Sequence, residues 1–320
     1  MVDIIPFDEA IKAAGKNCSL MVANGFSIKY FRYGNLLERA GLDADSSLRR
    51  LFDALSTVDF ELVIRALEDA ALVEGTYNKE KRAELLSSEA DKLRSALVHA
   101  VRVTHPEHRE NIADQIPACV EFLSQFDTIF TLNYDLLLYW VILENTKQFQ
   151  DGFGLAEDRD GFRWHFKTEA YCNVYNLHGG LHLFKTDNDE LEKRIDQGSG
   201  VIDAIASTIT QTKRLPLYVA EGTSVQKLAR IYAMPYLRHC YEMLECSDNA
   251  FFVYGHSAGQ NDAHIYDAIF SSDISHLYFC IHKPTANIDD INGELSRYQK
   301  RNGSDVKFTL VDAETAKVWG

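Results

Sequence analysis

Polar residues that could do chemistry stand directly after short apolar runs of the chain. Asn133 and Asp135 follow the run 128–131, and side chains two positions apart share one face of an extended segment. An amide beside a carboxylate suits ribose hydroxyls or an attacking water. The same two residues also suit the capping of a helix that begins at Leu136, since Asn and Asp are good N-cap residues. From the residues alone, both interpretations remain open.

A histidine forms the next cluster. His178 follows the run 173–177 and precedes Gly179 and Gly180, so its imidazole can face a substrate, and an unperturbed pKa of about 6.5 suits general-base catalysis. A single histidine is more often a structural residue. His182 lies four positions further on, but two glycines intervene, so the pair does not predict a metal site.

The first apolar run ends in a glycine turn. Asn24 and Gly25 follow residues 19–23. Glycine at a strand-to-helix turn lets the backbone approach a pyrophosphate, although such a glycine is often needed for the turn itself. The cluster 221–224, after the run 217–220, admits the same two interpretations.

The last cluster carries a serine. Residues 255–259 match the pattern G-x-S-x-G, which in α/β hydrolases presents a nucleophilic serine. A serine hydrolase that uses Ser257 is therefore an alternative. Its base would have to be His264, His276 or His282.

Short apolar runs indicate which elements position these clusters. Seven runs are typical of buried strands: residues 19–23, 128–131, 173–177, 217–220, 250–254, 276–281 and 306–311. Segments with helical spacing separate several of them: residues 118–126, 136–144, 224–230 and 263–270. This alternation predicts a Rossmann-like, doubly wound, mostly parallel α/β sheet. Ligands of such sheets bind beyond the carboxyl ends of the strands, so the polar clusters should converge there.

The stretch between the first two predicted strands breaks the alternation. It is rich in Ala, Leu, Glu, Lys and Arg, which favour helices. We expect an all-helical insertion over residues 44–117, with residues 1–43 and 118–320 forming the Rossmann-like domain. The charges of the insertion fit a solvated helix face better than a binding surface. The polar stretch 186–200 predicts a loop.

Composition and charge narrow the classes of function. The 320 residues include 33 basic and 47 acidic side chains, a net charge of −14, which disfavours nucleic acid as a partner. No apolar run reaches the about 18 residues of a membrane span. None of the six cysteines belongs to a C-x-x-C pair, so neither a zinc ribbon nor a disulfide framework is expected. We expect a cytoplasmic protein that binds no metal, no nucleic acid and no membrane.

Taken in order, the clusters resemble the motifs of the sirtuin-like superfamily, and within it the bacterial sirtuin-like NAD hydrolases of phage defence. The sirtuin pattern G-A-G-x-S corresponds to Ala23, Asn24, Gly25, Phe26 and Ser27. The pattern T-Q-N-x-D corresponds to Thr131, Leu132, Asn133, Tyr134 and Asp135. The H-G of the catalytic loop corresponds to His178 and Gly179, and G-T-S corresponds to Gly255, His256 and Ser257, with Asp262 downstream.

This resemblance implies that the bound nucleotide is NAD. It implies that His178 is a base, that Asn133 holds the attacking water and that Asp135 fixes the ribose. It also places the pyrophosphate near Gly25 and Ser27, and the adenosine nearer Ser257 and Asp262.

The departures from the sirtuin pattern bear on the reaction. Ala23 replaces the first glycine, Leu132 replaces the glutamine, and the zinc ribbon is absent. The missing ribbon favours relatives that hydrolyse NAD to nicotinamide and ADP-ribose over deacylases and ADP-ribosyltransferases. Nicotinamide is a cationic leaving group, so its loss requires a stabilised oxocarbenium-like ribose and a positioned water rather than a strong acid.

Two alternatives accompany this hypothesis, the second of which is the serine hydrolase that would use Ser257. A module that binds NAD or ADP-ribose without turnover is the first, because Ala23 and Leu132 depart from the pattern where catalysis is most demanding. The resemblance to defence proteins also implies a homo-oligomer or a protein activated by a partner, and the helical insertion is where we expect self-association.

Overall fold

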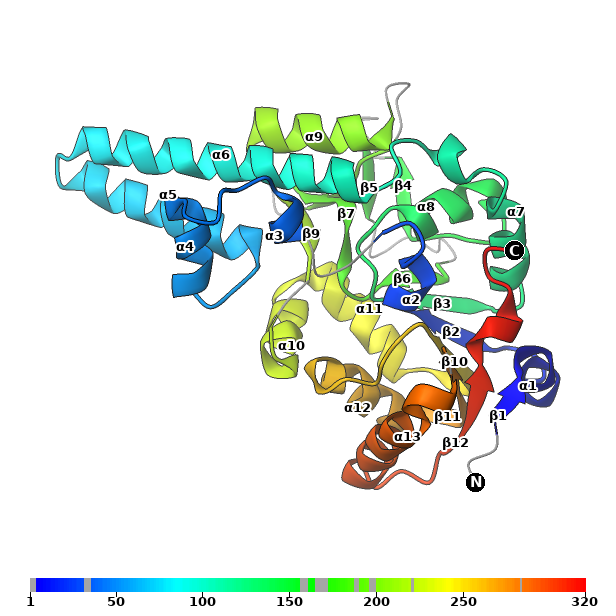
Figure 1. Ribbon diagram of the computed structural model, residues 1–320. Coiled ribbons are helices and arrows are strands. Elements are labelled where there is room, and N and C mark those ends of the chain that lie inside the picture. The colour runs from blue at the N-terminus through cyan, green and yellow to red at the C-terminus, as the bar shows by residue number, and fades with distance from the viewer. Residues whose placement is uncertain are drawn as a thin grey trace.

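A seven-stranded parallel sheet forms the centre of the molecule (Figure 1). The computed structural model describes residues 4–31, 36–155, 161–164, 172–186, 190–195, 200–219, 222–282 and 284–320. The strand order is β1-β12-β11-β10-β2-β3-β6, and every neighbouring pair is parallel. The strands are β1 (Ile4–Pro6), β2 (Ser19–Val22), β3 (Thr128–Thr131), β6 (Val174–Asn176), β10 (Asp248–Tyr254), β11 (Asp273–Ile281) and β12 (Lys307–Asp312).

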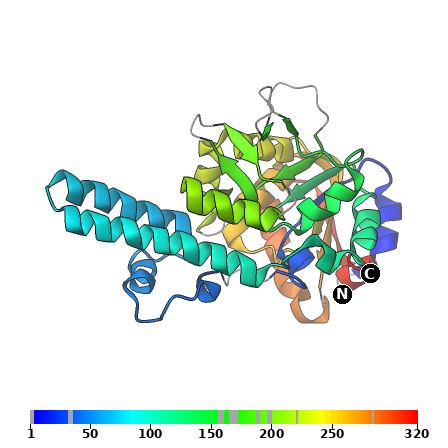
Figure 2. The same cartoon turned by 90° about the horizontal axis from the view of Figure 1, so that it is seen from above.

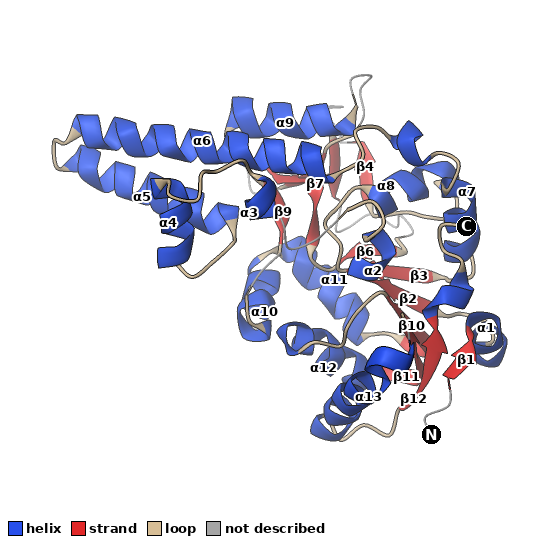
Figure 3. Ribbon diagram, viewed as in Figure 1, coloured by secondary structure: helices blue, strands red, loops and turns tan. Residues whose placement is uncertain are grey.

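Both faces of this sheet are buried. Along β2, Leu20 and Val22 belong to one hydrophobic core, and Met21 belongs to a second core on the opposite face, as the alternation of side chains along a strand requires. The first core includes side chains of α1 (Phe7–Ala14), α7 (Ile116–Leu123) and α8 (Leu137–Ile142). The second includes side chains of α11 (Pro235–Glu245), α12 (Ala263–Ser271) and α13 (Pro284–Arg301) (Figure 3). The predicted Rossmann-like, doubly wound sheet is confirmed.

A second, antiparallel sheet was not expected from the sequence. Its order is β4-β5-β8-β7-β9, and the strands are β4 (Phe153–Leu155), β5 (Phe162–Trp164), β7 (Gly179–Lys185), β8 (Leu191–Lys193) and β9 (Pro216–Tyr218). The prediction of a strand of the parallel sheet at 217–220 was therefore wrong, because β9 pairs antiparallel with β7. A short apolar run does not reveal the direction of its partner.

The predicted loop at 186–200 was also wrong in part, because β8 lies within it. Residues 187–189 and 196–199 of that stretch lie outside the described residues, as do residues 220 and 221 of the predicted cluster 221–224 and its preceding strand.

The insertion is helical. It contains α4 (Ser47–Ala54), α5 (Phe60–Thr76), α6 (Glu80–Thr104) and the short helix η1 (Arg109–Ile112), and α3 (Leu36–Arg39) precedes it. It lies between β2 and β3, which are the second and third strands of the chain. The sequence prediction placed it between the first two strands because it missed the short strand β1. Helices α5 and α6 form a hairpin that projects from the body of the molecule (Figure 2).

The remaining helices connect the strands. They are α2 (Asn24–Ser27), α9 (Val201–Thr212), α10 (Ser224–Ala233), and the short helices η2 (Leu143–Asn145), η3 (Gln260–Asp262) and η4 (Ala313–Ala316). The predicted helices at 118–126, 136–144, 224–230 and 263–270 correspond to α7, to α8 with η2, to α10 and to α12. Among the described helices, none is both long and apolar enough to cross a bilayer.

Candidate functional site

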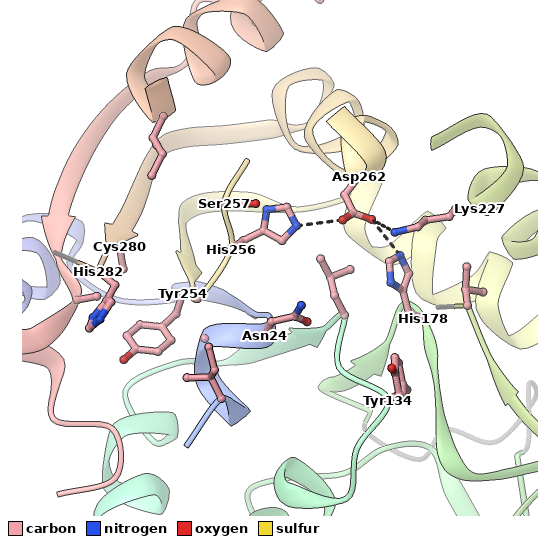
Figure 4. A pocket seen from close by; sticks show the side chains of 17 residues that line it. Asn24, Tyr134, His178, Lys227, Tyr254, His256, Ser257, Asp262, Cys280 and His282 are labelled. Atoms are coloured by element: carbon pink, nitrogen blue, oxygen red, sulfur yellow. Dashed lines mark hydrogen bonds and ion pairs between the residues drawn. The ribbon is translucent and has the colours of Figure 1, made fainter. Parts of the chain in front are cut away.

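A cavity of about 660 Å³ opens at the carboxyl ends of the parallel strands (Figure 4). This is the edge at which doubly wound sheets bind ligands, and the volume lies within the range of small-molecule sites. The predicted site residues that line it are Asn24, Gly25, His178, Gly255, His256, Ser257 and Asp262. The structure therefore brings together residues from three of the clusters singled out in the sequence.

Gly25 and Gly255 hold two loops of the cavity wall against each other. The Gly25 N–H donates to the Gly255 carbonyl at 2.8 Å, and a Cβ atom on Gly25 would lie 2.5 Å from the Gly255 Cα. Only a residue without a side chain fits there. Contact between the two loops thus accounts for both glycines.

Asn133 and Asp135 do not line the cavity. They share one face of the chain beyond β3, as predicted, but Leu132 and Tyr134 face the cavity instead. Side chains alternate along an extended segment, so the sequence identified the pair correctly but not the direction in which it points.

Asn133 joins two loops behind the cavity. Its amide nitrogen donates to the Ala23 carbonyl at 3.0 Å and to the Ser27 hydroxyl at 2.9 Å, and its N–H donates to Thr131 Oγ1 at 2.9 Å. Its Oδ1 is buried and has no hydrogen-bond partner among the described residues. Of the predicted contacts, Ala23, Phe26, Ser27, Thr131 and Gly179 likewise lie outside the cavity lining.

Asp135 lies one residue before Leu136, the N-cap residue of helix α8. Its Oδ1 accepts from the Leu137 N–H at 2.7 Å, so it satisfies a backbone donor at the start of the helix without occupying the N-cap position. Burial raises its pKa to about 6, although the nearby Ser27 hydroxyl and the Leu137 N–H lower it.

His178 is the predicted base, and it lies at the cavity wall between β6 and β7. Its carbonyl accepts from the Val219 N–H at 2.9 Å, and Gly179 beside it has a φ of +73°, at which a Cβ atom would overlap the Leu217 carbonyl. The loop is thus held against the segment that follows β9. Burial lowers the pKa of His178 to about 3, so the imidazole is neutral at physiological pH.

Asp262 lies beside His178. Its Oδ1 accepts from Lys227 Nζ at 2.8 Å, its Oδ2 lies 3.2 Å from His256 Nε2, and its Oδ1 lies 3.9 Å from His178 Nε2. Burial opposes its ionisation, but His256, His178 and Lys227 outweigh that effect and hold the pKa of Asp262 well below its usual range. Asp262 is therefore a carboxylate.

Three residues here could offer atoms to a metal ion. Ligand atoms of His178, Asp262 and His264 lie within 4.8 Å of one another, and His264 Nδ1 is fixed at 3.0 Å from Ser224 Oγ. The ammonium of Lys227, however, already lies on Asp262. A divalent ion would have to displace that cation, so the charge balance of the cluster favours an ion-paired network over a metal centre.

Sequence reasoning missed several cavity residues. Lys227 lies within helix α10, and Tyr254, Cys280 and His282 lie at the ends of β10 and β11 (Figure 4). The strand-end positions follow from the rule that ligands bind at carboxyl ends. Nothing in the sequence around Lys227 distinguishes it from the other lysines.

The serine hydrolase alternative finds no support in the geometry. Ser257 is exposed, and within the described part of the chain its hydroxyl has no hydrogen bond to a histidine. His256 turns toward Asp262 (Figure 4), and His264 contacts Ser224.

The fold and the cavity define a Rossmann-like α/β protein with a histidine and a carboxylate at the strand-end site. A family model described as a domain of unknown function (DUF4917) matches residues 20–319, so the chain belongs to that family. No curated protein matches it. The chain is similar to a solved structure described as "Crystal structure of a SIR2 homolog-NAD complex", with 12% identity, coverage of 94% of this chain and 97% of that chain, and a TM-score of 0.39. A TM-score this low carries no conclusion about function.

Proposed function

We propose that this protein binds NAD in the strand-end cavity and hydrolyses it to nicotinamide and ADP-ribose. The observation that carries the proposal is that Asn24, Gly25, His178 and Gly255, which stand at positions of the sirtuin-like motifs, all line one cavity. Its position and volume suit a nucleotide.

In this reaction the protein catalyses one chemical step, the displacement of nicotinamide by water. The glycosidic C–N bond breaks, its electron pair leaves with the nicotinamide nitrogen, and a water oxygen bonds to the ribose carbon. His178 accepts the proton of that water, directly or through a ribose hydroxyl that regains its own proton from the water, and passes it to solvent. Asn133 contributes by fixing the loop that carries Gly25, since its amide binds Ala23 and Ser27.

Nicotinamide release by the purified protein tests this proposal. We expect His178→Ala to lower the rate by a factor on the order of 10². His182→Ala is the matched control, because His182 is also buried but does not line the cavity. Equal rates in the wild type and His178→Ala would remove His178 from the mechanism, and no release under any condition would leave only binding.

Binding without turnover is a second candidate. The favouring observation is that Leu132, which replaces the sirtuin glutamine, lines the cavity with an apolar side chain. Calorimetric titration with NAD and with ADP-ribose should then give saturable heat and no product. Absence of heat with both ligands would contradict both candidates.

A role in phage defence, with self-association or a partner as the trigger, belongs to the same proposal and rests on the motif resemblance alone. Expression of the wild type and of His178→Ala in a phage-sensitive bacterial host tests it. Protection by the wild type only is the expected result, and equal plaque counts in both would contradict it.

A further inference from the structure

Asp262 lies among basic side chains from three separate parts of the fold. Lys227 comes from α10, His256 from the loop after β10, and His178 from the loop between β6 and β7. Figure 4 shows all three pointing at the one carboxylate. All four side chains are mostly buried, with exposed fractions between 5% for His178 and 18% for Asp262.

The protons of two of these contacts can be assigned. His256 Nδ1 accepts from the Ala258 N–H at 2.9 Å, so Nε2 carries the proton and donates to Asp262 Oδ2. The Lys227 ammonium can only donate, and it takes Oδ1. His178 Nε2 is buried and has no hydrogen-bond partner among the described residues.

Electrostatics then decide the tautomer of His178. If Nε2 were unprotonated, its lone pair would face the carboxylate across 3.9 Å, which is repulsive. If Nε2 carries the proton, Asp262 attracts it, and a buried N–H requires such an acceptor. The other groups that act on His178 are Lys227, His264 and His256, and none of them is an anion.

We propose that Asp262 is a positioning residue that holds His178 in the Nε2–H tautomer and so leaves Nδ1 as the proton acceptor for the molecule in the cavity. The inference rests on the proposed function only in assigning that acceptor a substrate. We expect the 3.9 Å contact between Asp262 and His178 to shorten when a ligand closes the site, as catalytic hydrogen bonds often do.

Lys227 weakens the contact between Asp262 and His178, because both side chains face the same carboxylate oxygen. Its ammonium occupies Asp262 Oδ1, the atom nearest to His178 Nε2. It keeps the carboxylate ionised, and it also competes with His178 for the carboxylate. Removing the ammonium should therefore strengthen the contact between Asp262 and His178, whereas removing the carboxylate charge should abolish it.

The tautomer can be measured directly by long-range ¹H–¹⁵N NMR correlation of the histidine rings at pH 7, with His178 assigned from its absence in His178→Gln. We expect Nε2–H in the wild type, retention in Asp262→Glu and Lys227→Met, and loss of the Nε2–H preference in Asp262→Asn. Asp267→Asn is the matched control, because Asp267 lies on α12, contacts Arg301 and does not line the cavity.

Two results would overturn the inference: an Nδ1–H tautomer in the wild type, or an unchanged tautomer in a folded Asp262→Asn. If Asp262→Asn fails to fold, the wild-type tautomer and its retention in Asp262→Glu still decide the matter. Because the spectra are recorded without substrate, a protein that never hydrolyses NAD leaves this result intact. If hydrolysis is observed, we expect Asp262→Asn to lower kcat by about 10²-fold and Asp262→Glu to restore part of it.

Discussion

Asn133 shows how a side chain can serve a site without facing it. It donates to the Ala23 carbonyl and the Ser27 hydroxyl from a fully buried position. Asn133→Ala removes the donor to the Ser27 hydroxyl and one of two donors to the Ala23 carbonyl, which still accepts from the Phe26 N–H, so we expect the free energy of unfolding to fall by about 1–2 kcal/mol. Urea denaturation measures this loss. The control Gln211→Ala, at an exposed position of α9, should change it by less than about 0.5 kcal/mol, and a similarly small change at Asn133 would contradict the role.

His105 makes the protein sensitive to acid. Its Nε2 accepts from the Leu136 N–H at 3.1 Å and its Nδ1 lies 2.9 Å from the Pro106 carbonyl, so both nitrogens are satisfied only in the neutral ring. Burial lowers its pKa to about 4. Below pH of about 6.5 the unfolded chain therefore binds a proton that the native state does not, and stability is lost as the pH falls toward 4.

Measurement of this effect requires the free energy of unfolding at two pH values. Between pH 7 and pH 5, His105→Gln should lose about 2 kcal/mol less than the wild type, whatever its stability at pH 7. His108→Gln serves as the control, since His108 is exposed. Identical losses in the wild type and His105→Gln would show that His105 titrates normally in the folded protein.

At the scale of elements, the contact between the loops after β2 and β10 shapes the cavity. A Cβ on Gly25 would overlap the Gly255 backbone, so Gly25→Ala must push the loops apart. We expect a fall in unfolding free energy of about 2 kcal/mol or more and at least a tenfold weaker NAD affinity in calorimetric titration.

Gly293→Ala is the matched substitution for Gly25→Ala. Gly293 lies in α13 and has no atom within 4 Å of its Cβ position, so alanine should stabilise the helix by up to about 1 kcal/mol. Equal effects of the two substitutions would argue against the close approach of the loops.

The sequence predicted those elements whose signal is local. Buried runs such as 250–254 stand out because both faces of a central strand are apolar, and six of the seven predicted strands belong to the parallel sheet. The strands β1, β4, β5 and β8 were missed because strands of three residues are too short to show a period. Strand β7 has seven residues, but it was missed because its first two residues, Gly179 and Gly180, are typical of a turn. Helix α13 also carries no prediction, since its apolar residues are few.

The location of the site could be predicted from the sequence, but the contacts between its side chains could not. Ligands of doubly wound sheets bind at the carboxyl ends of the strands, and this rule correctly placed Gly25, His178 and Gly255 at one cavity. The rule could not tell that Asn133 turns away from the cavity. Alternate side chains of an extended segment point in opposite directions, and the sequence does not show which set faces the cavity. Nor could it find Lys227, whose contact with Asp262 depends on how α10 packs on η3.

At the scale of the whole molecule, the arm formed by α5 and α6 divides into two parts. Residues 72–89 include no buried side chain, whereas Ala90, Leu93 and Leu97 are buried in the first core. Local stability follows burial, so amide hydrogens of 72–89 should exchange more than about tenfold faster than those of 90–101. Hydrogen–deuterium exchange read by mass spectrometry measures both segments.

Equal protection of the two segments would contradict this expectation and would mean that another surface covers the tip in solution. A dilution series separates the two cases. Protection of 72–89 that falls on dilution indicates self-association through exposed residues such as Leu72 and Tyr77, and concentration-independent rapid exchange indicates a solvated tip.

Helix α10 ties the base of the arm to the cavity. Arg230 of α10 pairs with Asp59 and Glu61 at the start of α5, and Lys227, three residues earlier and on the same face of α10, holds Asp262. Helix α6 has 25 residues, a length of about 37 Å. A tilt of about 5° at the base therefore moves the tip by about 3 Å. A movement of the tip would act on α10 through the ion pairs of Arg230. Helix α10 also carries Lys227, whose ammonium binds Asp262 beside His178.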